Sequence, residues 1–176
     1  PEVSGHGDLH DLDPHVWLAP MYAVVILEEM ATVLSGYAPD QAASIAQRAA
    51  SMRVELEALD ARLRERLAPL SGQRLLAYHP ALGYFARAYG LRQVAVESGG
   101  TEPGARHLTV IAQQMREQSL RVLVVEPQFA PHRARALAGS LDLEVVVLDP
   151  LAVDLVGELE RFSIALVDSN RGEDHP

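Results

Sequence analysis

The stretch "RVLVVEPQFAPHRARALAGSLDLEVVVLDP", residues 121–150, decides the fold of this chain. Two short apolar runs, 122–125 and 145–148, flank a segment at 131–140 with helical character. Neither run alternates between apolar and polar residues, which is typical of parallel strands covered by helices on both faces. The stretch therefore predicts a strand, a helix and a second strand of an open α/β sheet.

Similar strand–helix units extend outward from this stretch in both directions. The predicted strands are 74–79, 92–98, 121–127 and 143–150, and the predicted helices are 80–89, 104–118, 131–140 and 153–168. Four such units in a row predict an α/β fold with a four-stranded, mainly parallel sheet flanked by helices. In sheets of this kind, ligands bind beyond the carboxyl ends of the strands.

The first part of the chain is predicted to be helical. "PMYAVVILEEMATVL" (20–34) is an apolar helix with proline in its first turn and Gly36 at its end. Further on, apolar residues alternate at spacings of four and three, namely Ile45, Ala49, Met52, Leu56, Leu59 and Leu63. They predict an amphipathic helix over 40–67, about 40 Å long. This periodicity fits a two-helix hairpin and also a strut longer than the domain on which it packs.

These patterns divide the chain into three segments. Residues 1–14 are a loop containing His, Gly and Asp, residues 15–69 are a helical segment with the long connecting helix, and 70–176 are an α/β lobe. A length of 176 residues suffices for one well-buried domain.

Composition excludes several classes of function. The formal net charge of −9 argues against nucleic acid or an anionic membrane as the partner, because binding phosphate needs a basic face. The chain has no cysteine, so neither a disulfide nor a thiolate metal site is available. No apolar run reaches the length that spans a bilayer. "GGTEPG" (99–104) lacks the glycine spacing and the lysine of a nucleotide-binding loop.

One imidazole and three carboxylates stand at the predicted strand ends: His79, Glu97, Glu126 and Asp149. Imidazole and carboxylate are ligands of zinc and, with more oxygen, of manganese. Each residue also has an ordinary structural interpretation. His79 fits a cap of the following helix, Asp149 a turn carboxylate before Pro150, and Glu126 a buried structural carboxylate. Glu97 is expected to lie in solvent.

A further histidine lies far upstream, in "DLDPHVWLAP" (11–20). His15 stands between two prolines and beside Trp17, the only tryptophan in the chain. A histidine on such a rigid turn is typical of a ligand, but a single residue does not make a site. No H-E-x-x-H or other zinc-hydrolase signature is present.

Four motifs together resemble the solute-binding proteins of zinc and manganese ABC importers. They are "DPHVWLAP" (13–20), "AYHPALGYFARAYGL" (77–91), "VVEPQFAPHRARALA" (124–138) and "VVVLDPLAVDL" (145–155), and the resemblance extends from Asp13 to about Asp168. It implies two α/β lobes joined by a long rigid helix, with a metal ion between them. The N-terminal lobe, with one further histidine ligand, would precede residue 1.

The resemblance also implies a set of metal ligands. His15, His79 and Asp149 match the family's ligand positions, and histidine rather than glutamate at position 79 favours Zn²⁺ over Mn²⁺. Asp13 is expected to accept a hydrogen bond from the other ring nitrogen of His15. Glu126 matches a recurrent position near the cleft and is expected to support the site without binding the ion.

The implied function is that of a receptor, not an enzyme. It would capture zinc and hand the ion to the membrane permease of an ABC importer, in the periplasm or anchored outside the membrane. A long helix without its other lobe would favour a homo-oligomer. The alternatives are a manganese or iron(II) receptor of this adhesion-like lipoprotein family, a zinc-dependent hydrolase with Glu126 as general base, and a structural or adhesive module with a vestigial site.

Overall fold

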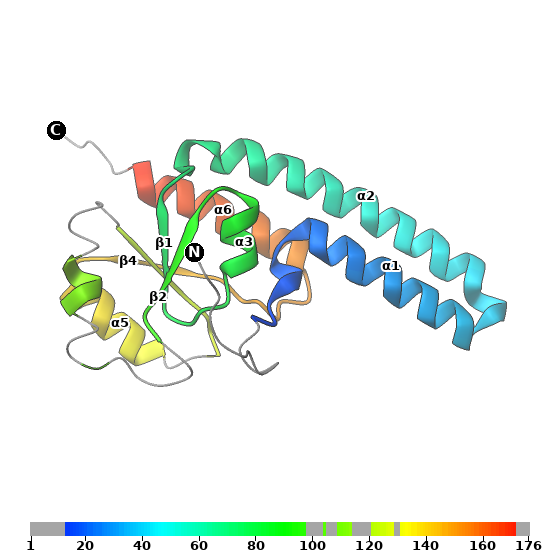
Figure 1. Ribbon diagram of the computed structural model, residues 1–176, viewed down its shortest axis with the longest axis horizontal. Coiled ribbons are helices and arrows are strands. Elements are labelled where there is room, and N and C mark those ends of the chain that lie inside the picture. The colour runs from blue at the N-terminus through cyan, green and yellow to red at the C-terminus, as the bar shows by residue number, and fades with distance from the viewer. Residues whose placement is uncertain (1–12, 98–103, 105–108, 114–120, 129–130, 172–176) are drawn as a thin grey trace, which may run out of the picture.

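The computed structural model of the chain describes residues 13–97, 104, 109–113, 121–128 and 131–171. Its strands are β1 (Arg74–Ala77), β2 (Arg92–Ala95), β3 (Val122–Val125) and β4 (Glu144–Val147). They form one four-stranded sheet in the order β2-β1-β3-β4, and all three pairings are parallel. The α/β fold with a parallel sheet, predicted from the unalternated apolar runs, is confirmed (Figure 1).

Helices occupy the predicted positions before, between and after the strands. They are α1 (Pro20–Tyr37), α2 (Ala42–Leu67), α3 (Gly83–Ala88), α5 (Pro131–Ser140) and α6 (Leu155–Arg171). Short 3₁₀ turns lie at Val16–Leu18, Pro39–Gln41 and Ala68–Leu70. Of the helix predicted at 104–118, residues 109–113 are described and helical, while most of the predicted loop 1–14 lies outside the described residues.

The end of α1 differs from the sequence prediction. The helix continues through Gly36 to Tyr37 instead of ending at Leu34. Proline 39 supplies the stop, because the residue before a proline is driven out of the helical region. Ala38 accordingly has φ −130° and ψ 71°.

The sheet buries a core on each of its faces. Alternate residues of the same strand face opposite sides, so that Leu75 and Ala77 of β1 belong to one core and Leu76 to the other. The larger core also contains side chains of α2, α3 and α6, among them Leu63, Phe85 and Phe162. The smaller core lies under α5 and includes Leu123, Val125, Ala134 and Ile111.

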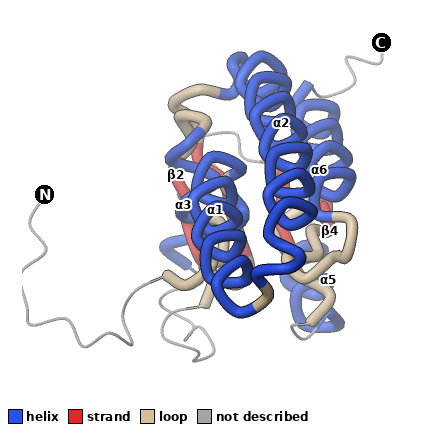
Figure 2. The backbone as a smooth tube through the Cα atoms, turned by 90° about the vertical axis from the view of Figure 1, so that its right-hand side faces the viewer, coloured by secondary structure: helices blue, strands red, loops and turns tan. Residues whose placement is uncertain are grey.

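α1 and α2 form a hairpin that projects from the body of the molecule (Figures 1 and 2). The C-terminal half of α2 packs on the body, where Leu59, Leu63 and Leu67 are fully buried. Its N-terminal half leaves the body, and there Met52 and Val54 are 43% and 65% exposed. Within the described residues, no helix has the length and apolarity needed to cross a membrane.

Candidate metal site

The register of the sheet brings three polar residues into one row at its carboxyl edge. Ala77 of β1 pairs with Ala95 of β2 and with Val124 of β3. The residues two positions further along the three strands are His79, Glu97 and Glu126. Because side chains alternate along a strand, this row faces the same side as Ala77 and Val124, which belong to the larger core.

The turn that carries His15 packs on this same core through Leu18, which is fully buried. Asp13 holds the turn together, because its Oδ1 accepts hydrogen bonds from the His15 backbone N–H at 2.9 Å and from His15 Nδ1 at 2.8 Å. The second bond fixes the ring and leaves Nε2 as the nitrogen on the far side of the imidazole from Asp13.

Gly83 at the start of α3 allows Asp13 to lie where it does. A Cβ at position 83 would stand 2.7 Å from Asp13 Oδ2, closer than a non-bonded contact permits. Any larger residue at this position would therefore displace the Asp13 carboxylate, and with it the acceptor that orients His15. Sequence reasoning assigned Gly83 no role, because the approach joins segments 70 residues apart.

His15 and His79 meet at the carboxyl edge of the sheet. Their ring centroids are 5.5 Å apart and the rings are nearly perpendicular, at 85°. His79 Nδ1 lies 3.2 Å from Glu97 Oε2, so this ring is also oriented by a carboxylate. The two histidines that the sequence singled out thus lie side by side.

The prediction that Glu97 lies in solvent is wrong. Its side chain is only 13% exposed and contacts His79. The physical reason is that the ladder between β1 and β2 continues past the end of β2: the Glu97 N–H donates to the Tyr78 carbonyl at 2.9 Å. This extra pairing carries Glu97 alongside His79.

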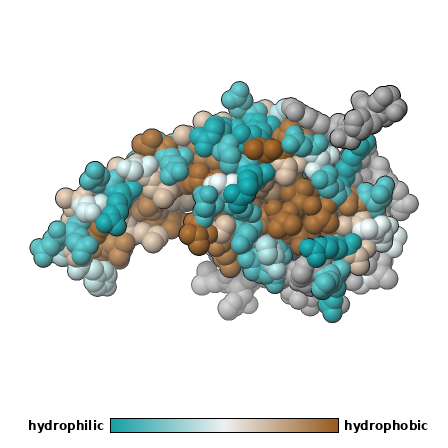
Figure 3. Space-filling view, turned by 180° about the vertical axis from the view of Figure 1, so that it is seen from behind, coloured by the Kyte–Doolittle hydropathy of each residue, from teal (hydrophilic) through white to brown (hydrophobic). Residues whose placement is uncertain are grey.

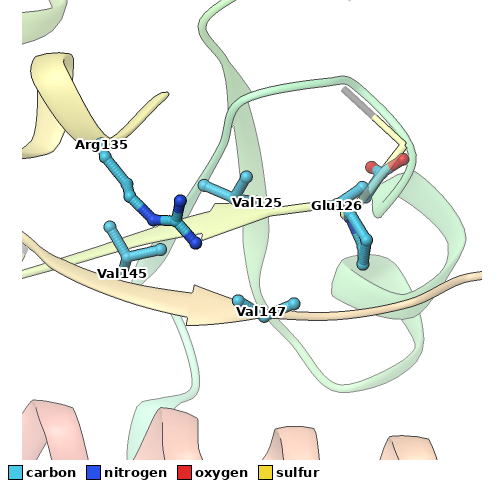
Figure 4. A pocket seen from close by; sticks show the side chains of 6 residues that line it. Val125, Glu126, Arg135, Val145 and Val147 are labelled. Atoms are coloured by element: carbon cyan, nitrogen blue, oxygen red, sulfur yellow. The ribbon is translucent and has the colours of Figure 1, made fainter. Parts of the chain in front are cut away.

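Glu126 is the most buried carboxylate of this edge, at 3% exposure. Among the described residues, its Oε2 has no hydrogen-bond partner. Burial, together with the nearby charges of Glu97, Asp13 and Asp149, raises the pKa of Glu126 to about 7. In Figure 4 the Arg135 guanidinium lies over the valines of β3 and β4, while the Glu126 carboxylate extends away from it beyond the end of β3.

Asp149 stands one residue out of this row, because β4 pairs Val147 with Val125. Its Oδ1 accepts hydrogen bonds from the Leu151 N–H at 3.0 Å and from Gln128 Nε2 at 2.6 Å. Asp149 therefore serves as a turn carboxylate here, which was one of its two interpretations from the sequence. The charge of Asp149 also contributes to the raised pKa of Glu126.

The structure thus brings some of the predicted ligands together more closely than others. His15 and His79 contact each other, whereas the Asp149 carboxylate is engaged in its own turn. Within the described part of the chain, no group of three or more histidine, aspartate and glutamate side chains is arranged to hold a metal ion. The set of His15, His79 and Asp149 accordingly stays a prediction.

Comparison with known proteins places the chain among zinc-uptake components. Residues 1–161 match the family model for the periplasmic component A of the zinc-uptake complex, ZnuA. The zinc-binding lipoprotein AdcA of Streptococcus pneumoniae is 31% identical over 147 residues, which cover 82% of this chain and 29% of that protein. The high-affinity zinc uptake system protein ZnuA of Haemophilus influenzae is 31% identical over 139 residues, covering 78% and 41%.

Solved structures agree with this fold. A crystal structure of ZnuA superposes with a TM-score of 0.84 at 32% identity, covering 90% of this chain and 62% of that one. A zinc-bound deletion mutant of ZnuA gives the same TM-score and identity over 93% and 63%. The laminin-binding protein of Streptococcus agalactiae, 24% identical with a TM-score of 0.81, shares the fold. The chain spans less than two thirds of each of these proteins.

Proposed function

The chain belongs to the family of the periplasmic zinc-uptake component ZnuA, and on that premise we propose that it captures Zn²⁺ for an ABC importer. The family is the one that the four sequence motifs resembled. It is a family of binding components, not of enzymes, as predicted. Zinc is the cargo of such a protein, bound and released without chemical change.

The observation that carries the proposal is the contact between His15 and His79. Zinc binds an imidazole nitrogen at about 2 Å. An ion at that distance from one nitrogen of each ring fits between rings whose centroids are 5.5 Å apart. Because Asp13 and Glu97 each engage a ring Nδ1, both imidazoles are oriented before the ion arrives.

Asp149 completes the proposed ligand set. To reach the ion, its carboxylate would give up the hydrogen bonds from Gln128 and Leu151. This requires a rearrangement only within the turn that contains Asp149. Asp13 then orients His15, and Glu126 supports the site from the next strand. Two imidazoles favour Zn²⁺ over Mn²⁺, which prefers a shell richer in oxygen. A manganese or iron(II) receptor is the alternative within the family.

The remaining parts of the chain have roles consistent with this function. Residues 70–176 would form the C-terminal lobe of the receptor, residues 15–69 the helical segment with the connecting helix, and 1–14 a loop that contains histidines. The receptor would act outside the cytoplasmic membrane, in the periplasm or as a lipoprotein, and deliver zinc to the importer's permease. Self-association through the exposed hairpin stays a prediction that sedimentation velocity would test.

Zinc titration against a competing chelator tests the proposal. Replacing either His15 or His79 with alanine should weaken zinc binding by roughly 10- to 100-fold or more, since each removes one ligand. Binding should also weaken as the pH falls from about 7.5 to about 5.5, because imidazole binds metal in its neutral form. Zinc should raise the melting temperature more than manganese does.

His132→Ala is the matched control, because His132 is exposed on α5 and should leave zinc affinity unchanged. Equal zinc affinity in the wild-type chain and in a His15→Ala/His79→Ala double variant would rule out this site. Tighter binding of manganese than of zinc would instead favour the alternative receptor.

A further inference from the structure

The indole of Trp17 connects the two turns that carry proposed ligands from opposite ends of the chain. Its Nε1 donates a hydrogen bond of 2.9 Å to the carbonyl of Pro150, across 133 residues of sequence. His15 lies two residues before Trp17, and Asp149 is the residue before Pro150. No other interaction described above joins these two turns directly, among the residues that the structure covers.

Each of the two turns is held firmly at its own base. On one side, Trp17 packs against the larger core, and its ring centroid is 5.5 Å from that of His15. On the other side, Pro150 is buried, and the Asp149 N–H donates to Glu158 Oε1 of α6 at 2.8 Å. The hydrogen bond from the indole N–H therefore joins two rigid turns. The length and direction of this hydrogen bond set the separation between the two turns.

We propose that Trp17 is a positioning residue for zinc capture, whose indole N–H fixes the His15 turn in register with the Asp149 turn. This inference rests on the proposed function. An ion that needs ligands from both turns binds tightly only when the turns are already at the correct separation. Otherwise part of the binding free energy is lost in ordering the two turns, and the affinity falls. The hydrogen bond to Pro150 maintains that separation in the absence of metal.

Trp17→Phe tests this role by keeping an aromatic ring and removing the donor. Zinc affinity should fall by about 10-fold or more, as for other residues that orient metal ligands. The visible absorption spectrum of the Co²⁺-loaded protein should change as well, because the spectrum reports ligand geometry. A residue that contributes only to folding would leave that spectrum unchanged.

Tyr89→Phe is the matched control. It removes one aromatic donor as well, the bond of 3.1 Å from the buried Tyr89 hydroxyl to Asp60 Oδ1. Tyr89 ends α3 beside the Gly72–Gly90 contact, at the amino edge of the sheet and opposite the site. This variant should lower the melting temperature without changing zinc affinity or the Co²⁺ spectrum.

If Trp17→Phe does not fold, a semisynthetic chain with benzothiophene in place of the indole keeps the ring shape and still removes the N–H. Weaker zinc binding and an altered Co²⁺ spectrum in either version support the inference. Wild-type affinity and spectrum in a folded version overturn it. That outcome leaves the proposed function intact if His15→Ala still weakens binding. If His15→Ala does not weaken zinc binding either, both the inference about Trp17 and the proposed function are wrong.

Discussion

The α/β body (residues 70–171) and the helical hairpin (α1 and α2) use apolar side chains in different ways. The two central strands of the body are buried on both faces: β3 is buried at all four of its positions and β1 at three. The hairpin instead presents apolar side chains outward, with Val25 63%, Met30 55% and Leu34 50% exposed. In Figure 3 apolar surface is visible at several places along the hairpin and in a larger patch over the body.

This difference teaches that the two regions are stabilised to different extents by their own contacts. In the body, replacing a buried side chain creates a cavity or leaves a buried polar group without a hydrogen-bond partner. On the outer half of the hairpin, the same substitution changes a side chain that already contacts water. The proposed metal site lies at the body, to which the His15 turn is attached through the buried Leu18. Its histidines are therefore held by packing and by hydrogen bonds before any ion is present.

The largest expected effect comes from one substitution made in both regions. Leu123→Ala, at a fully buried position of β3 in the body, should lower the free energy of unfolding by about 2 to 5 kcal/mol. Leu34→Ala on the hairpin, at a half-exposed position, should lower it by less than about 1 kcal/mol. Urea unfolding with unchanged m-values measures both. Equal losses would show that the two regions are equally well packed.

A medium effect is expected at Glu126 and depends on pH. Its pKa is raised from 4.5 to about 7, so the folded chain binds this proton more tightly than the unfolded chain does. The resulting stabilisation is fully present below about pH 4.5 and is lost as the pH rises to about 7. Glu126→Gln should therefore stabilise the metal-free protein at about pH 8, by at most about 3 kcal/mol, and lose that advantage near pH 4.

Chemical denaturation at several pH values, with a chelator present, measures the effect of Glu126→Gln. Glu29→Gln, on the exposed face of α1, is the control from the hairpin and should leave the pH dependence of the wild type unchanged. A pH dependence that survives in Glu126→Gln would mean that another group of the body causes it.

The smallest effect concerns two arginines of α2. Arg66 contacts Glu160 and Ser163 of α6 at 2.7 Å each, and Arg66→Ala should cost about 1 kcal/mol. Arg53 bonds Glu28 and Glu57 on the hairpin but is exposed, so Arg53→Ala should leave stability unchanged within error. Thermal melts at low and high salt compare them. A larger loss for Arg53 would contradict the comparison.

The fold was largely predictable because the apolar runs of the strands carry no alternation and glycine or proline separates them. Residues 122–125 and 144–147 form strands within a residue of the predicted cores. The helix end at Tyr37 was missed because Gly36 allows a helix to continue, whereas Pro39 stops it. The low helix propensity of glycine destabilises a helix without ending it, whereas the steric effect of proline on the preceding residue ends it.

The site was predictable in its residue types but not in its register. Sequence identified His15, His79, Glu126 and Asp149, yet only strand pairing shows that Glu97 lies beside His79 and that Asp149 is offset by one residue. A shift of one residue in the strand pairing would turn the side chains that follow the strands to the other face of the sheet. The close approach of Asp13 to Gly83 likewise depends on tertiary packing, for which the local sequence gives no signal.

Trp17 has one more consequence, which is optical. As the only tryptophan in the chain, it is the sole source of indole emission, and it lies between the His15 ring and the Pro150 carbonyl. Excitation at the long-wavelength edge of the aromatic absorption band, where tyrosine no longer absorbs, therefore reports on this one place in an unlabelled molecule. The chain contains its own fluorophore where its two distant turns meet.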